Sequence, residues 1–143
     1  MHNQPAYDTN IVLALKKSIR QIDALIDAHL YKYQIPRTQY RVMFYVANNP
    51  DITQSALVKL MEIQASTLTL MIDSLVKKGI IERRKTEVDK RINYLCLTTK
   101  GLEKFQQLPN PSSLIDEFVR ERLGDQSITD LISGLNALNQ LLS

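Results

Sequence analysis

The chain has 143 residues, a length that suits one domain with a buried core. Its apolar fraction of 44% and charged fraction of 23% are ordinary for a globular protein. A single cysteine excludes an internal disulfide, the two histidines lie far apart, and no apolar run approaches the ~20 residues of a membrane-spanning helix. We therefore expect no structural zinc site, no cofactor and no membrane segment. The first ten residues lack a basic start and an apolar core, so we also expect no signal peptide and a cytoplasmic protein.

The positive charge is concentrated in one segment. The net charge is only +3, yet residues 77–104 hold nine basic and four acidic side chains, whereas residues 105–143 hold two basic and five acidic ones. A local basic patch on a nearly neutral chain indicates a local anionic partner, such as a phosphate backbone. A solvated face would give the same pattern, so the charge alone does not decide.

Two long amphipathic segments lie near the ends of the chain. In residues 9–31 apolar side chains recur every three or four positions, which predicts a helix of about twenty residues with one apolar stripe. Asp8 or Thr9 could cap its start. Residues 113–142 are interrupted at "GDQS" and end in a second such helix from Ile128. Helices this long in a small protein usually pack against another long helix, in the same chain or in a partner. The stripes consist of Ile11, Leu15, Ile19, Ile22, Ile26 and Leu30, and of Ile128, Leu131, Ile132, Leu135, Leu138 and Leu142.

Three shorter helices are expected between these segments. The first, "TQYRVMFYVANNP", would end at its two asparagines and proline. Thr53 is placed to cap "QSALVKLM". A tight connection, "EIQA", then leads to "STLTLMIDSLVKKG", which Gly79 would end. The side chains expected to face inward are Tyr40, Met43, Phe44 and Ala47 in the first helix, Leu57, Leu60 and Met61 in the second, and Leu68, Met71, Ile72 and Leu75 in the third.

After Gly79 the pattern changes to short strands. "IIERR" and "INYLCLT" are β-prone runs separated by the charged "KTEVDK", which predicts a two-stranded hairpin. Thr98 can cap the next helix, "TKGLEKFQQL", and "PNPSS" ends that helix. The order of short helix, tight turn, longer helix with a small polar start and basic hairpin is typical of a helix-turn-helix, whose second helix enters the DNA major groove. The basic side chains of the hairpin would reach the flanking backbone or the minor groove: Arg83, Arg84, Lys85, Lys90 and Arg91.

Taken together, these motifs resemble the winged-helix core of the MarR (multiple antibiotic resistance regulator) family. "SALVKLMEIQASTLTLMIDSLVKKGIIERR" is followed by "DKRINYLCLTTKG", with an Asp-x-Arg at the wing tip, a strand ending in Leu-Thr, and a Gly three residues later. Those residues are Asp89, Arg91, Leu97, Thr98 and Gly101. The resemblance implies a mainly α protein with a small β-hairpin wing (α+β). It also implies a single domain over residues 1–143, dimerisation helices at 9–31 and 113–142, and a DNA-binding lobe at 38–98.

The resemblance also implies a function. The family implies a homodimer that binds a pseudo-palindromic operator in double-stranded DNA, usually represses transcription, and is released by a small ligand or an oxidant. By position, Ser66, Thr67 and Thr69 would lie on the reading face of the recognition helix, and Arg91 would enter the minor groove with Asp89 holding its guanidinium. Two positions depart from the pattern: Leu70 stands where many relatives have a base, and Gln64 where a Ser or Asp cap is common.

Other interpretations stay open for several residues. Ser66, Thr67 and Thr69 could be solvated helix residues, and Asp89 with Arg91 a surface ion pair. Alternation along Leu95-Cys96-Leu97 turns Cys96 away from the leucines, outward if they face the core, near basic side chains that could activate a thiol. The family's oxidant-sensing cysteine, however, lies in an N-terminal helix. For a small aromatic or phenolic effector the candidates near the junction of the two regions are His29, Tyr33, Arg37 and Tyr40.

Two rival functions arise from these open points. One is a winged-helix module that binds another regulator, which the acidic C-terminal segment and the missing base at Leu70 favour. The other is a redox-responsive repressor that uses Cys96. The sequence contains no Cys/His pair, carboxylate dyad or phosphate-binding glycine loop, so no enzymatic activity is expected.

Overall fold

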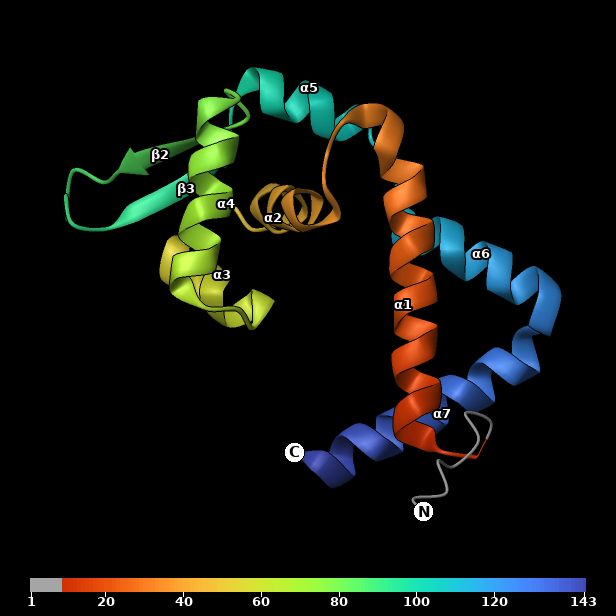
Figure 1. Cartoon of the computed structure of the whole chain (residues 1–143). Helices are drawn as coiled ribbons and strands as arrows, with labels where there is room; N and C mark the ends of the chain where they lie inside the picture. The colour runs from red at the N-terminus through yellow and green to blue at the C-terminus, as the bar shows by residue number, and fades with distance from the viewer. Residues whose placement is uncertain (1–8) are drawn as a thin grey trace, which may run out of the picture. The chain divides into compact units, whose positions relative to one another are not determined.

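The computed structural model describes residues 9–143, which form a mainly helical chain with one small sheet (Figure 1). The predicted fold class is confirmed. The described chain divides into two compact units: a central unit, residues 30–109, and a terminal unit, residues 9–29 and 110–143. In chain order the elements are α1 (Ile11–Leu30), the 3₁₀ turn η1 (Tyr31–Tyr33), α2 (Arg37–Asn48), β1 (Ile52–Thr53), α3 (Gln54–Met61), α4 (Ala65–Lys77), β2 (Ile81–Lys85), β3 (Asn93–Leu97), α5 (Thr99–Gln107), α6 (Pro111–Leu123) and α7 (Asp125–Leu142).

The sheet of the central unit has three antiparallel strands in the order β1-β3-β2. The hairpin of β2 and β3 was expected, and Arg83 pairs with Leu95 within it. The expectation of two strands was incomplete, because β1 lies on the other side of β3 and pairs Ile52 with Leu95. Two residues are too few to show the alternation by which a strand is predicted from sequence. The sheet therefore ties the segment before α3 to the hairpin.

The core of the central unit lies between α2, α3, α4 and the sheet. Of the four α4 side chains expected to face inward, Leu68, Ile72 and Leu75 are fully buried and Met71 is half-buried. Phe44 and Leu60 were expected to face inward, but they are 37% and 47% exposed. Compared with the face expected from the sequence, the buried face of α2 is shifted around the helix, and Phe44 lies beside it. The residues on this buried face include Gln39, Val42, Met43 and Val46. In α3 the buried pair is Leu57 and Met61.

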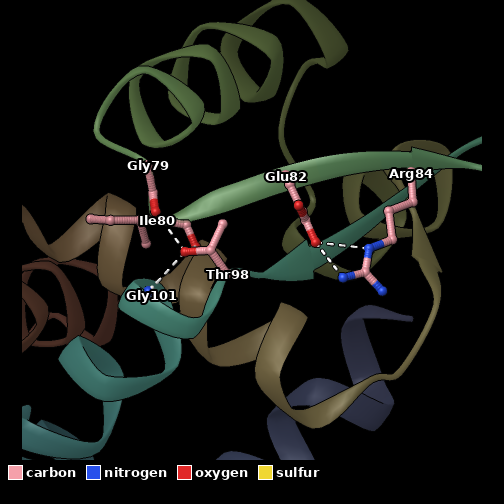
Figure 2. A network of polar contacts seen from close by, with 6 residues as sticks. All are labelled: Gly79, Ile80, Glu82, Arg84, Thr98 and Gly101. Carbon is pink, nitrogen blue, oxygen red and sulfur yellow. Dashed lines mark hydrogen bonds and ion pairs between the residues drawn. The ribbon is translucent and has the colours of Figure 1, made fainter.

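Thr98 connects β3, α5 and the end of α4 (Figure 2). Its hydroxyl donates to the carbonyl oxygen of Gly79 and accepts from the N–H of Gly101 at 2.9 Å, so it caps α5 as predicted. Gly101 packs directly on the main chain of Ile80: a Cβ at this position would lie 1.9 Å from the Ile80 carbonyl oxygen. Only glycine fits so close an approach. The Leu-Thr and glycine motif thus fixes the junction between the hairpin and α5. The other predicted cap is also present, since Thr53 accepts from the N–H of Ala56.

The terminal unit consists of α1, α6 and α7. Asn10, next to the expected cap Thr9, accepts from the N–H of Leu13 at 3.0 Å and caps α1. The alternative cap, Asp8, lies outside the described residues. α7 begins at Asp125, three residues before the predicted start at Ile128, because only Gly124, with φ of +79°, separates it from α6.

Few side chains of the terminal unit are buried. Ile128 is the one member of the predicted α7 stripe that is buried, while Leu131, Ile132 and Leu142 are exposed.

Within the described residues no single helix is both long and apolar enough to cross a membrane; α3 and α4 reach that length and composition only when taken as a bent pair.

Candidate nucleic-acid interface

The start of α4 is open to solvent. Gln64, the residue before the helix, has extended backbone angles and its side chain makes no capping hydrogen bond. The first N–H groups of a helix have no partner inside the helix, and together with the helix dipole they attract anions. Gln64 replaces the usual Ser or Asp at this position. The first N–H groups of α4 therefore donate no hydrogen bond to the side chain of the capping residue.

The predicted hydroxyls of α4 fall into two groups. Ser66 and Thr67 are exposed in the first turn of the helix. Thr69 is half-buried, and its hydroxyl donates to the carbonyl oxygen of Ala65 at 2.9 Å and accepts from the side-chain amide of Gln54 at 2.8 Å. Thr69 thus ties α4 to the start of α3. We call the outward set Ser66, Thr67 and Leu70 the reading face; Leu70 is 72% exposed.

The wing comprises β2, β3 and the connecting loop 86–92, and its closed end projects beyond α4 (Figure 1). The loop is organised by its own side chains. The Thr86 hydroxyl accepts from the N–H of Asp89 and donates to its carbonyl oxygen, both at 3.0 Å. The Asp89 carboxylate accepts from the main-chain N–H of Arg91 at 2.9 Å. The expected contact of Asp89 was with the guanidinium of Arg91; in the structure the carboxylate orders the main chain and leaves the Arg91 side chain exposed.

The five basic residues predicted on the wing differ in their surroundings. Arg83 bonds to Asp73 of α4 at 2.5 Å and so joins the wing to that helix. Arg84 pairs with Glu82 on the same strand (Figure 2), and this hydrogen bond raises the pKa of Arg84. The positive charge of these two arginines is therefore partly compensated. The exposed cations toward the tip of the wing are Lys85, Lys90 and Arg91.

Comparison with known proteins identifies this arrangement. The sequence model of the MarR family matches residues 35–92, from just before α2 to the wing tip. A protein of Thauera aromatica named as a regulator of the hcr operon is 29% identical over 99 residues, 69% of this chain, and the match spans 60% of that protein's length. The transcriptional regulator HosA of Escherichia coli O111:H- is 28% identical over 117 residues, 77% of this chain and 86% of HosA. These matches support assignment of the chain to the MarR family, whose model covers residues 35–92.

Solved structures agree with the family at the level of the fold. The repressor CouR, bound to a 23-mer DNA duplex, superposes with a TM-score of 0.80 at 21% identity over 92% of this chain and 94% of CouR. MepR of S. aureus, in a DNA complex, superposes with a TM-score of 0.84 at 16% identity over 92% of this chain and 97% of MepR. These findings support a DNA-binding transcriptional regulator rather than an enzyme.

The residues expected at an effector site lie in both units. His29 belongs to the terminal unit, where it is exposed and its Nδ1 lies 2.7 Å from the carbonyl oxygen of Leu25. Tyr40 is buried in the central unit and stacks on Phe105, and its burial raises the pKa of the phenol. Arg37 is half-buried in the same unit. Tyr40 thus packs in the central unit, and its part in an effector site stays a prediction.

Tyr33 lines an open pocket of about 360 Å³ in the central unit. The other lining residues come from α5, and the sequence analysis missed them. Their spacing places them on one polar face of that helix, and a polar helical face is usually just solvated, so the sequence held no signal that distinguishes a pocket. These residues are Lys100, Glu103, Lys104 and Gln107.

Leu95 is fully buried on β3, as the alternation predicted, but Cys96 and Leu97 are both half-buried, so the alternation does not extend to Leu97. The partner of Cys96 across the sheet is Glu82, the carboxylate that holds Arg84. The thiol therefore lies opposite an ion pair, whose Arg84 is the kind of basic neighbour that the sequence suggested. Among the described residues, no group of three or more His, Cys, Asp or Glu side chains could hold a metal ion.

Proposed function

We propose that this chain is a cytoplasmic transcriptional repressor that binds a pseudo-palindromic operator as a homodimer and is released by a small ligand. The observation that carries the proposal is the presence, on one compact unit, of the exposed reading face and a basic wing ordered by its own side chains, joined by the Arg83–Asp73 pair. The likeness of the fold to CouR and MepR, both solved with DNA, supports it.

In this proposal each lobe, residues 38–98, grips DNA at two places. α4 enters the major groove, where the hydroxyls of Ser66 and Thr67 meet base edges or phosphates, while Thr69 holds α4 against α3. Arg91 enters the adjacent minor groove, whose negative potential favours a guanidinium. Contacts to the DNA phosphates fix the position of the protein but do not distinguish one base sequence from another. In this proposal Arg83, Arg84, Lys85 and Lys90 make these contacts.

The homodimer accounts for the apolar surface of the terminal unit. Ile11, Ile19 and Leu131 are each more than half exposed, although they belong to continuous helical stripes. Stripes of this length are normally covered by another helix, and a second copy supplies the same stripes. We assign the contact to residues 9–31 and 113–142. A two-fold dimer presents two copies of α4, which match half-sites about 34 Å apart on a pseudo-palindromic operator.

Release by a small aromatic or phenolic effector is the remaining part of the proposal. The pocket beside Tyr33 offers an aromatic wall and two cationic groups, Lys100 and Lys104, to an aromatic acid. Such a ligand needs only to favour a dimer whose recognition helices miss the half-site spacing.

The test is a titration of DNA from upstream of the protein's own gene with the whole chain. Binding is monitored by fluorescence anisotropy at several salt concentrations. Binding should weaken steeply with salt. Arg91→Ala should reduce the affinity roughly tenfold by removing the minor-groove contact. Lys32→Ala, which removes an exposed positive charge outside both the DNA-binding lobe and the assigned dimer contact, is the matched control and should bind like the wild type. Unchanged binding by Arg91→Ala would refute the wing assignment, and a chain that shows no salt-sensitive binding to any DNA would instead be a protein-interaction module.

A further inference from the structure

The reading face carries an apolar side chain that the core does not use. Leu70 lies four residues after Ser66 and three after Thr67, so the three share one face of α4. The buried side of the helix is formed by Leu68 and Ile72, each 0% exposed, whereas Leu70 is 72% exposed. Leu70 therefore points away from the core and in the same direction as the two exposed hydroxyls.

The neighbours of Leu70 on α4 are engaged within the protein. The hydroxyl of Thr69 is held by Ala65 and Gln54. Asp73, one turn further along the same side, bonds to Arg83 of the wing. The first two turns of α4 thus present two exposed hydroxyl side chains and one branched alkyl side chain to a binding partner.

The chemistry of the major groove restricts what such an alkyl group can recognise. Leucine neither donates nor accepts hydrogen bonds, so it cannot read guanine, adenine or cytosine through their donor and acceptor groups. The 5-methyl group of thymine is the apolar feature that base edges present in this groove. We propose that Leu70 recognises one thymine in each half-site through its 5-methyl group and so fixes a base that the hydroxyls of Ser66 and Thr67 do not specify. This inference rests on the proposed function, since it requires α4 to lie in the major groove.

The experiment removes the methyl group from the DNA. The whole wild-type chain first selects a binding duplex from a random-sequence library. Each thymine of that duplex is then replaced, one at a time, by deoxyuridine, which keeps the hydrogen-bonding pattern and lacks only the methyl group. At one thymine per half-site the replacement should weaken wild-type binding roughly three- to tenfold, the cost of exposing a buried methyl contact.

The protein variants assign that loss to one side chain. Leu70→Ala should bind the thymine and deoxyuridine duplexes equally, and Leu70→Met, which keeps an apolar side chain of similar reach, should still prefer thymine. Leu60→Ala, which truncates an exposed leucine of α3, is the matched control and should discriminate like the wild type. Leu70 makes little contact with the core, so its variants are expected to fold, and circular dichroism checks this.

The possible failures are distinguishable. If a duplex is selected but no single methyl group affects wild-type binding, the inference is wrong and the proposed function stands. The same conclusion applies if Leu70→Ala keeps the full preference for thymine. If the wild-type chain selects no duplex, both the proposed function and the inference fall.

Discussion

The two units of the chain differ in how they bury their apolar side chains. Within the described residues nearly every buried apolar side chain belongs to the central unit, and the terminal unit contributes only Pro111 and Ile128. The central unit also has short-range polar ties, from Thr98, Thr69 and Asp89. It can therefore hold its reading face and wing in place by itself. The terminal unit leaves long apolar stripes uncovered in a single chain, which is why we assign the dimer contact to it.

The largest effect should come from placing a charge in the α1 stripe. Ile19 is 56% exposed in one chain, and a second copy would cover it. Ile19→Glu should therefore raise the dissociation constant of the dimer by at least ~100-fold, because a carboxylate would be buried without a partner. Sedimentation velocity over a range of concentrations measures this. Leu60→Glu introduces the same charge at a leucine of similar exposure in the central unit and should leave the dimer intact. A dimer of unchanged affinity in Ile19→Glu would show that the stripe is not the interface.

Two helical glycines, one in each unit, provide the next comparison. Gly101→Ala should lower the free energy of unfolding by about 3 kcal/mol, because its Cβ would clash with the main chain of Ile80. Gly134 of α7 has open space around its Cα. Gly134→Ala should therefore raise the free energy of unfolding by about 0.5–1 kcal/mol through its higher helix propensity. Urea denaturation at one fixed protein concentration measures both. A destabilising Gly134→Ala would mean that another copy packs against this face of α7.

Helix caps should show a smaller difference. Thr98→Ala should lower the free energy of unfolding by about 1–2 kcal/mol, because the N–H of Gly101 loses its partner. Thr98→Ser keeps the hydroxyl and should behave like the wild type. In the terminal unit Asn110 caps α6 through a longer hydrogen bond, 3.3 Å to the N–H of Ser113. Asn110→Ala should consequently cost less than Thr98→Ala in the same denaturation experiment, and an equal cost would contradict the ranking.

The smallest effects should come from the exposed ion pairs. Arg83 and Asp73 in the central unit, and Arg120 and Asp116 in the terminal unit, are partly solvated pairs. A double-mutant cycle of Arg83→Gln and Asp73→Asn should give a coupling energy of at most ~1 kcal/mol, and the corresponding cycle at Arg120 a similar value. A clearly larger coupling in the first cycle would mean that the wing depends on this pair for its position.

Local signals in the sequence predicted the features that depend on a few adjacent residues. The caps Thr53 and Thr98 were found because a hydroxyl before a helical pattern acts on an N–H three residues later. The hairpin was also predicted, because two β-prone runs flank a charged loop. The exposed positions of Ser66 and Thr67 agree with the α4 periodicity, which turns Leu68 and Leu75 inward.

The remaining features depend on contacts between distant segments. A periodic pattern gives the direction of a stripe but not its edges, so Phe44 and Leu60 were wrongly placed inside. The carboxylate of Asp89 had two acceptable partners in Arg91, the guanidinium and the main-chain N–H, and only the loop geometry selects the second. The engagement of Thr69 by Gln54 requires α3 and α4 to meet, which spacing along one helix cannot reveal.

The loop at the wing tip has a consequence for the thermodynamics of binding. Thr86 and Asp89 close the loop with their own hydrogen bonds, and Asp89 also fixes the main chain at Arg91. When the wing meets a groove, the torsions of the Arg91 side chain remain to be ordered while the loop is already in place. Ordering a flexible segment on binding subtracts from affinity. A wing that is ordered beforehand avoids most of that entropic cost, so its interaction energy is retained as affinity.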